Sequence, residues 1–474
     1  MSENEYTTQL AVIGAGPGGY PAAFFAADSG ICVTLIDSEP NPGGVCLYRG
    51  CIPTKTLLHV AEVIQQAGEA EAWGVHFDKP KVHIEKIRSW KDCVVQKMTA
   101  GLGQLCRQRN IEYIQGRARF LDSQSLEVTT QTGVIKRIAF ENVIVSSGSH
   151  PASIPGISTD SPRILFSDEA LDLPDIPKTL LVVGGGYIGL EMGTIYATLG
   201  SEVSVVEMMP DILPGADSDL VRTYSMTAKK CFRSIMTNTT VTDMEDTPDG
   251  INVNLKNREG ATEHQVFDKV LVTIGRKPNS EGLGLENTRV KIDGNGFVCV
   301  DPQRRTAEPS VYAIGDIVGG AMLAHKATHE GRVAVEAILG RKTAFQPKAI
   351  PAVLFTDPEV AWCGLTENEA KEKGVEVQIA KFPWGASGRA ASLGRMDGLT
   401  KLIIDPGTEV ILGVGLVGPG AGELISEGAL AVEQELKASD LARTIHPHPT
   451  LSETLMEAAE VFYGHCTHVY RPKR

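Results

Sequence analysis

The chain begins with an apolar run, a glycine turn, a helix-like stretch and a second apolar run. The first run ends at Ile13, and Gly14, Gly16 and Gly19 follow it directly, before the helix-like stretch PAAFFAADSG. The second run, ICVTLID, ends at Asp37. This order of strand, turn, helix and strand predicts a parallel βαβ unit at the N-terminus.

The same order returns in TLLVVGGGYIGLEMGTIYATLGSEVSVVE, which contains Gly184, Gly186 and Gly189 and ends at Glu207. The first glycine precedes the terminal acid by 23 residues in both units. The repeat predicts two α/β units of the same design.

The remaining pattern divides the chain into four segments. The stretch from the first cysteines to about residue 110 is largely helical in pattern, EYIQGRARFLDSQSLEVTT predicts short strands, and the region from about Ile350 alternates strands and helices. Thr366 with Glu369, and Gly374 beyond them, predict a capped helix there. We predict that residues 1–155 form the first part of one dinucleotide-binding domain and that residues 280–348 form its second part. Residues 156–279 are predicted to form a second dinucleotide-binding domain, and residues 349–474 a C-terminal α+β domain.

Composition narrows the class of protein. At about 150 residues per domain, 474 residues suggest roughly three domains, and 42% apolar with 22% charged residues is typical of a soluble globular protein. A net charge of -13 argues against a nucleic-acid partner and against binding to an anionic membrane. The N-terminal MSENEYTTQL has neither a basic nor an apolar targeting segment, so we expect a cytoplasmic protein. Nine scattered cysteines are not a secreted disulfide framework.

Each glycine motif follows a strand, opens a helix and is followed by an acid, which is the pattern of a dinucleotide site. The glycines allow backbone N–H groups to approach a pyrophosphate, and the acid can accept from a ribose hydroxyl. Two glycine-rich turns without a ligand are the alternative. Glu207 would repel a 2′-phosphate, and no arginine follows it in VVEMMPDILPGAD, so the second unit is predicted to bind NAD rather than NADP.

Cys46 and Cys51 stand close together after Gly43 and Gly44. Zinc would need a second pair of ligands, and none is nearby in the sequence. Cys51 precedes a helix-like run whose N-terminus would stabilise a thiolate, and Lys55 follows one turn later. A redox dithiol is the functional interpretation, and two inert buried cysteines are the alternative.

A second candidate group lies near the C-terminus, in RTIHPHPTLSE. His446 and His448 could form a metal-binding H-x-H, but no cysteine or carboxylate triad surrounds them. Glu453 could orient the imidazole of His448 as a general base. An ordinary surface histidine is the alternative.

Together, GAGPGG, GGVCLYRGCIPTK, GGGYIGLEMG, VYAIGD, MLAHKA and HPHPTLSE resemble the flavin-dependent pyridine nucleotide–disulfide oxidoreductases over essentially the whole chain. Within that family the chain most resembles the dihydrolipoamide dehydrogenase branch, the E3 component of 2-oxoacid dehydrogenase complexes. The resemblance implies two Rossmann-like domains that bind FAD and NAD, with a C-terminal dimerisation domain. It also implies a homodimer whose partners are lipoyl domains and the E2 core.

The resemblance assigns roles to the candidate residues. Cys46 would exchange with the substrate thiol, and Cys51 would lie against the flavin as a thiolate. His448, oriented by Glu453, would serve as acid and base in the site of the other subunit. The implied cofactor contacts are Gly14, Gly16, Gly19, Asp37, Gly44, Lys55 paired with Glu191, Ala118, Gly184, Gly186, Gly189, Glu207, Gly275, Asp316 and Ala324.

Five residues depart from the family pattern without removing a reacting group. Asp37 stands where glutamate is more usual, Tyr48 and Arg49 replace Asn-Val, Thr54 replaces serine, and Pro447 replaces a small residue.

The predicted reaction is oxidation of protein-bound dihydrolipoyl groups through Cys46 and Cys51, with transfer of the electrons to NAD⁺. An NADPH-dependent reductase of a small disulfide such as glutathione is a rival, against which Glu207 and Gly189 count. A mercuric reductase would carry a terminal pair of cysteines, and this chain ends GHCTHVYRPKR. A non-enzymatic binding protein that keeps the fold is the rival of another class. We expect no metal and no membrane insertion.

Overall fold

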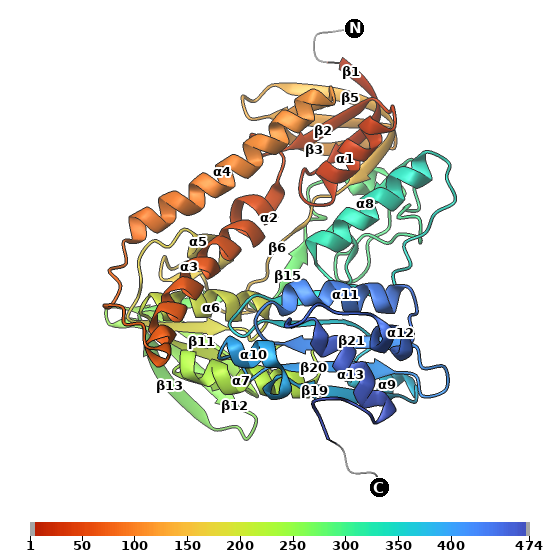
Figure 1. Cartoon of the computed structure of the whole chain (residues 1–474). Helices are drawn as coiled ribbons and strands as arrows, with labels where there is room; N and C mark the ends of the chain where they lie inside the picture. Colours follow the sequence, from red (N-terminus) through yellow and green to blue (C-terminus); the bar gives the residue numbers. More distant parts are fainter. Residues whose placement is uncertain (1–4, 471–474) are drawn as a thin grey trace. The chain divides into compact units, whose positions relative to one another are not determined.

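The structure is a computed structural model that describes residues 5–470 (Figure 1). The chain forms two units. The first holds the chain up to Leu57, together with His83–Ala152 and Gly275–Gln346. The second holds Leu58–Val82, Ser153–Ile274 and the chain from Pro347 onward.

A six-stranded sheet organises the first unit. Its central strand β1 (Glu5–Ile13) is parallel to β2 (Val33–Asp37) and to β5 (Ile135–Val145). β16 (Val311–Ala313) extends the sheet beside β5, and β3 (Glu112–Asp122) and β4 (Ser125–Thr130) complete it. β3 is longer than the short strand predicted, because every second residue from Ile114 to Phe120 is buried, as in a strand with one face on the core.

Helices pack against this sheet. α1 (Gly19–Asp28) follows the first glycine turn and packs on α8 (Ala324–Ile338). The predicted helical stretch forms α2 (Gly44–Arg49), α3 (Cys51–Glu69) and α4 (Ile84–Gln108).

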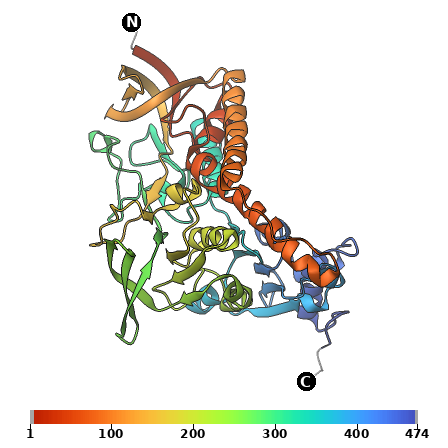
Figure 2. The same ribbon diagram turned by 90° about the vertical axis from the view of Figure 1, so that its left-hand side faces the viewer.

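The second unit contains the repeat of the first βαβ. Five short parallel strands lie in the order β10-β9-β8-β14-β7. The central strand β8 (Thr179–Val183) leads through the glycine turn into α6 (Tyr187–Leu199) and then to β9 (Glu202–Val206). A three-stranded antiparallel sheet lies beside it and shares its core (Figure 2). The other strands of this region are β7 (Ile164–Leu165), β10 (Ser234–Met236), β11 (Thr239–Thr247), β12 (Gly250–Asn257), β13 (Thr262–Phe267) and β14 (Lys269–Val272).

The C-terminal part of the second unit is an antiparallel sheet with helices packed on it. The strand order is β17-β18-β21-β20-β19, and α11 (Ala421–Glu433) and α13 (Glu453–Tyr463) pack on it. The predicted capped helix is confirmed as α9 (Glu367–Lys373): Thr366 Oγ1 accepts the N–H of Glu369, and Gly374 is left-handed. The strands are β17 (Ala352–Leu354), β18 (Val360–Gly364), β19 (Gln378–Pro383), β20 (Leu399–Ile404) and β21 (Ile411–Val417).

The other helices are α5 (Ser167–Leu171), α7 (Ser218–Cys231), α10 (Gly388–Ser392) and α12 (Ala438–Arg443). Within residues 5–470, no helix has both the length and the apolar character needed to cross a membrane. The predicted α/β class, with two glycine-turn units and a C-terminal α+β region, is confirmed.

Candidate active site

The first glycine turn is a close approach of backbone to backbone. Gly14 has a φ of +93°, and a Cβ there would lie 2.2 Å from the carbonyl oxygen of Ser146. A Cβ on Gly19 would lie 1.8 Å from the carbonyl oxygen of Gly14, so the first turn of α1 packs directly on the end of β1. Gly16 faces Gly44, whose Cβ would lie 2.5 Å from the Gly16 Cα. A side chain at Gly14, Gly19 or Gly44 would therefore push the turn apart.

Asp37 holds this turn through its carboxylate. Oδ2 accepts the N–H of Ala15 at 2.6 Å, and Oδ1 accepts the N–H of Glu39 at 2.9 Å. Burial raises the pKa of Asp37, although backbone hydrogen bonds from Ala15 and Ser38 act in the opposite direction. Each oxygen has a second lone pair. Asp37 can therefore make the predicted ribose contact while it also holds the turn.

The second glycine turn repeats these contacts in the second unit. A Cβ on Gly184 would lie 2.5 Å from the Thr273 carbonyl oxygen, and one on Gly189 would lie 2.3 Å from the carbonyl oxygen of Gly184. Glu207 Oε2 accepts the N–H of Gly185 at 2.7 Å, and Oε1 accepts the N–H of Met209 at 2.8 Å. The internal repeat therefore extends from sequence spacing to individual hydrogen bonds.

Cys46 and Cys51 come together where two helices meet. α2 contains Cys46, and α3 begins at Cys51 immediately after Gly50. A Cβ on Gly50 would lie 2.9 Å from the Val45 carbonyl oxygen and 3.2 Å from the Cys46 Cα, so only glycine allows so tight a junction. The structure describes both cysteines as thiols.

The electrostatics of the pair are asymmetric. A hydrogen bond with Cys51 raises the pKa of Cys46, burial raises it further, and the nearby charge of Lys55 lowers it only in part. Cys51 stands at the N-terminus of α3, where the helix dipole favours negative charge. This asymmetry favours Cys51 as the first thiolate of the reduced pair, and that role stays a prediction.

Three departures from the family pattern attach this segment to its surroundings. Arg49 forms an ion pair with Glu39, and Tyr48 donates its hydroxyl to the Asn41 carbonyl. Thr54 Oγ1 donates to the carbonyl of Gly50 at 2.6 Å. These side chains stabilise the segment around the cysteines.

Asp316 belongs to a polar network that the sequence did not reveal. Its Oδ2 accepts the Ser149 hydroxyl at 2.5 Å, and Arg276 Nε donates to that hydroxyl at 2.7 Å.

Glu330, with 0% of its surface exposed, accepts the N–H of Gly315 at 2.7 Å. Its other oxygen pairs with two basic residues, Arg304 at 2.9 Å and Lys326 at 3.0 Å. Only the four-residue spacing of Lys326 and Glu330 on α8 was a signal in the sequence.

The remaining residues that are predicted to contact the cofactors lie on several different elements of the two units. Ala118 is buried on β3, Ala324 begins α8, and Gly275 has a φ of +124° beside open space. Glu191 is buried on α6, and its Oε1 accepts the N–H of Phe355 at 2.9 Å. Lys55 and Glu191 belong to different units, so their pairing stays a prediction.

His448 and Glu453 form the predicted pair within the second unit. His448 Nδ1 lies 2.9 Å from Glu453 Oε1, and Glu453 Oε2 accepts the N–H of Thr450 at 2.7 Å. Burial acts against ionisation of Glu453, but the bonds from Thr450 and His448 lower its pKa. The His448 side chain is 74% exposed, so its ring is accessible.

His446 is not an ordinary surface histidine, which was the alternative interpretation of this motif. Its side chain is 4% exposed, and its Nε2 lies 2.8 Å from Glu427 Oε1. Its Nδ1 lies 2.9 Å from the Thr444 carbonyl oxygen. Both ring nitrogens are therefore engaged, which leaves His448 as the accessible histidine of the motif.

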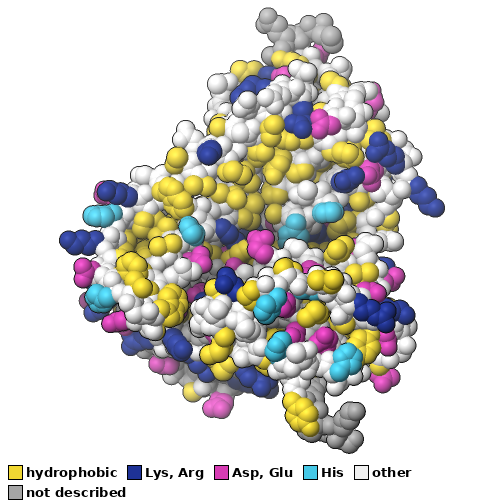
Figure 3. All heavy atoms as spheres, in the orientation of Figure 1, with side chains coloured by type: hydrophobic (Ala, Val, Ile, Leu, Met, Phe, Trp, Pro, Cys, Tyr) yellow, Lys and Arg dark blue, Asp and Glu magenta, His cyan; other side chains and the backbone are white. Residues whose placement is uncertain are grey.

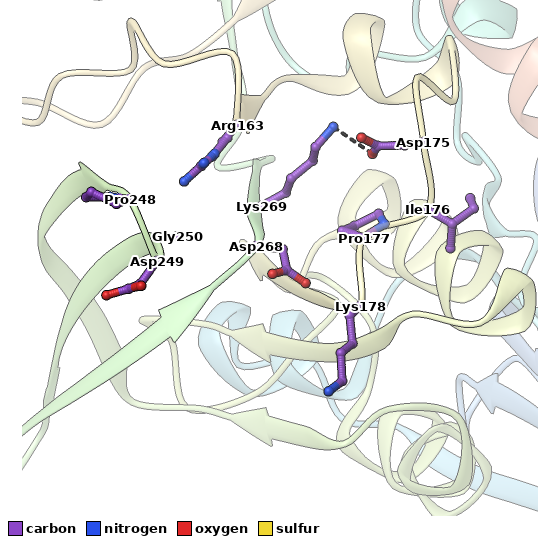
Figure 4. Close-up of a pocket in the computed structure, with 10 residues that line it drawn as sticks. All are labelled: Arg163, Asp175, Ile176, Pro177, Lys178, Pro248, Asp249, Gly250, Asp268 and Lys269. Carbon is purple, nitrogen blue, oxygen red and sulfur yellow. Dashed lines mark ion pairs between the residues drawn. The ribbon is translucent and has the colours of Figure 1, made fainter.

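A pocket of about 410 Å³ lies in the second unit, and none of the residues that line it is a predicted site residue (Figure 4). Its lining includes Lys178 and Lys269, which stand at the amino ends of β8 and β14. The second glycine turn follows the carboxyl end of β8, where α/β sheets bind dinucleotides. This pocket is therefore not the predicted dinucleotide site.

Comparison with known proteins gives consistent results. Residues 8–331 match the pyridine nucleotide-disulphide oxidoreductase family, and residues 350–459 match its dimerisation domain. The dihydrolipoyl dehydrogenase of Haemophilus influenzae is 46% identical over 463 residues, covering 98% of this chain and 96% of that protein. The dihydrolipoyl dehydrogenase of Thermus scotoductus is 44% identical, covering 98% of this chain and 99% of that protein.

Solved structures with the same fold include those of LpdA and RclA. LpdA from Mycobacterium tuberculosis superposes with a TM-score of 0.89 at 28% identity, over 96% of this chain and 99% of that one. The HOCl-induced flavoprotein disulfide reductase RclA from Escherichia coli superposes with a TM-score of 0.83 at 27% identity, over 94% of this chain and 98% of that one.

Proposed function

The chain belongs to the pyridine nucleotide-disulphide oxidoreductase family, and on that premise we propose that it has the activity for which its relatives are named, the oxidation of dihydrolipoyl groups with NAD⁺. The observation that supports this most is the Cys46–Cys51 junction, where one thiol is held protonated and its neighbour stands at a helix N-terminus. Such a pair is suited to thiol–disulfide exchange.

The exchange runs on the oxidised pair. A substrate thiolate attacks Cys46 Sγ, a mixed disulfide forms, and Cys51 leaves as the thiolate. The second substrate thiol then displaces Cys46, which closes the substrate disulfide and leaves Cys46 as a thiol. The substrate loses two electrons and two protons, and the Cys46–Cys51 disulfide is reduced to a thiol and a thiolate.

His448 accepts the proton that leaves the substrate thiol. Glu453 is an acceptor, so the bond to Nδ1 places the ring proton on Nδ1 and leaves the lone pair on Nε2. We therefore assign Nε2 as the proton acceptor, and Glu453 as the positioning residue.

The residues of both turns fit dinucleotides. A Cβ built on Gly186 would meet no atom within 4 Å, so there is room for a ligand to approach the backbone closely there. We propose that Gly14, Gly16, Gly19 and Asp37 hold FAD, and that Gly184, Gly186, Gly189 and Glu207 hold NAD. When bound, FAD and NAD supply the hydride chemistry that carries the two electrons onward.

The active form is a homodimer, and we propose lipoyl domains and the E2 core as its partners. The matched dimerisation domain supports dimer formation. Figure 3 shows apolar side chains gathered on the face that includes α4. Trp90, Met98 and Leu105 of α4 are exposed. Exposed apolar surface of this kind is typical of an interface. The four domain segments and the cytoplasmic location stay predictions.

One comparison of substrates tests the activity. We expect turnover with dihydrolipoamide and NAD⁺, little turnover with oxidised glutathione and NADPH, and loss of the former in Cys51→Ser. Cys299→Ser, which changes another exposed cysteine, is the matched control. Preferred use of oxidised glutathione and NADPH would establish the rival reductase instead, and absence of all turnover in a flavin-loaded protein would favour a binding protein.

A further inference from the structure

The end of α13 and the chain that follows it bring together a second group of reactive side chains. Glu457 and Glu460 lie three residues apart on the same face of α13. The helix ends at the left-handed Gly464, and the N–H of His465 bonds back to the Glu460 carbonyl at 3.2 Å. The chain therefore reverses, and Cys466 and His468 come back over the helix.

Three potential metal ligands converge there, and a fourth bonds to one of them. Cys466 Sγ lies 2.7 Å from one oxygen of Glu457, and His468 Nδ1 bonds to the other oxygen. The nearest ligand atoms of Glu457, Glu460 and Cys466 all lie within 4.8 Å of one another. The set contains a thiol, an imidazole and two carboxylates.

Among the described residues, the ion-pair partner of Glu457 is His468, and a histidine carries a charge only when it is protonated. Glu457 is only 4% exposed, and between residues 5 and 470 no lysine or arginine forms an ion pair with it. A buried carboxylate normally needs a cation partner.

In another acidic cluster of the chain, a lysine balances the negative charge of the carboxylates. Asp217, Asp219 and Glu367 also lie within 4.8 Å of one another. The buried ammonium of Lys401 lies among them, 2.7 Å from Asp217, 3.0 Å from Asp219 and 2.5 Å from Glu367. A lysine therefore fills the position that a metal would occupy in that cluster.

From this donor set, and because no lysine or arginine of residues 5–470 pairs with Glu457, we propose that Cys466, His468, Glu457 and Glu460 bind a divalent metal ion of the zinc type. Thiolate with imidazole selects zinc-like metals, whereas calcium and magnesium prefer sites made of oxygen alone. On binding, the thiol proton of Cys466 passes to solvent and the sulfur coordinates the metal as thiolate.

The position suggests what the metal does. Glu457 is one turn after Glu453 on α13, and Glu453 bonds to His448. A metal at Glu457 would fasten residues 465–468 to the helix that holds this carboxylate. The role is structural, beside the proposed acid–base pair and not part of it.

Zinc content tests the proposal on the flavin-loaded dimer with Cys46 and Cys51 kept oxidised, so that the dithiol cannot bind the metal. After incubation with zinc and dialysis against a weak chelator, we expect one zinc per chain, with one sulfur scatterer at about 2.3 Å in X-ray absorption. Cys466→Ser and Glu457→Gln should each weaken zinc binding at least about tenfold. Cys299→Ser should retain the metal.

Wild-type protein that keeps no zinc would overturn the proposal, and this result does not depend on any variant folding. Zinc that is retained without a sulfur ligand, or retained equally in Cys466→Ser, would overturn it as well. None of these outcomes depends on the proposed dehydrogenase activity.

Discussion

The Nδ1 atom of His448 lies 2.9 Å from Oε1 of Glu453, while the other ring nitrogen, Nε2, of its neighbour His446 lies 2.8 Å from Oε1 of Glu427. The two histidines differ in exposure, since the side chain of His448 is 74% exposed and that of His446 only 4%. The chain thus contains a proposed catalytic pair and a matched internal control.

Glu453→Gln should lower kcat for dihydrolipoamide oxidation by about 10–100-fold, because a neutral amide no longer holds the Nδ1 proton of His448 as strongly. Glu427→Gln should leave kcat within about twofold. Steady-state kinetics of both variants provides the measurement, and flavin content shows that they are folded. An equal loss in both variants would mean that the effect comes from the stability of this region.

Glu207→Ala should raise KM for NAD⁺ by about 10–100-fold, since the N–H groups of Gly185 and Met209 lose a charged acceptor. Bound FAD should be unchanged. Glu202→Ala, at the exposed start of β9, the strand that Glu207 follows, is the control. Loss of FAD with an unchanged KM for NAD⁺ would show that the two turns are assigned in reverse.

Two-electron reduction should give a long-wavelength absorbance from the Cys51 thiolate beside the oxidised flavin. Cys51→Ser should abolish this band, because a hydroxyl stays protonated, and Cys46→Ser should keep it, because the Cys46 thiol has the raised pKa. Anaerobic titration followed by absorbance is the measurement. A band that persists in Cys51→Ser would exchange the two roles.

Glu359 should make stability fall as the pH rises. Burial raises its pKa to about 7, against the N–H of Gly422, and the neighbouring carboxylates of Glu62, Glu423 and Asp357 add to the increase. A raised pKa favours the folded state below the unfolded value of about 4.3, and this contribution is lost as the pH rises through about 7.

Glu359→Gln should therefore gain about 1–3 kcal/mol relative to wild type between pH 5 and pH 8. Urea unfolding of both proteins at the two pH values measures this difference of differences. A difference that does not change with pH would exclude titration of Glu359 in this range.

A shared active site would show itself by complementation. Cys51→Ala and His448→Ala should each be nearly inactive, but a refolded equal mixture should recover roughly a quarter of wild-type activity. Each heterodimer then has one intact site, and about half of randomly paired dimers are heterodimers. Heterodimers that form without activity would show that both residues act within one chain.

The local features could be predicted from the sequence because they depend on neighbouring residues. A positive φ requires glycine at Gly14 and Gly184, and the equal spacing to Asp37 and Glu207 indicated a repeated βαβ unit. The capping box at Thr366 depends on two side chains three residues apart, and it forms as predicted. The sequence also identified Cys46 and Cys51 as a candidate redox dithiol, and His448 as a candidate general base oriented by Glu453.

Only the tertiary structure decided which side chains act together across long separations. Asp316 meets Ser149, which is 167 residues away in the chain, and buried Glu330 supports the adjacent Gly315. The difference between His446 and His448 depends on Glu427, which α11 places against only one of the two rings. Sequence spacing determines turns and helix faces, but the burial and partners of a polar side chain depend on how distant elements pack around it.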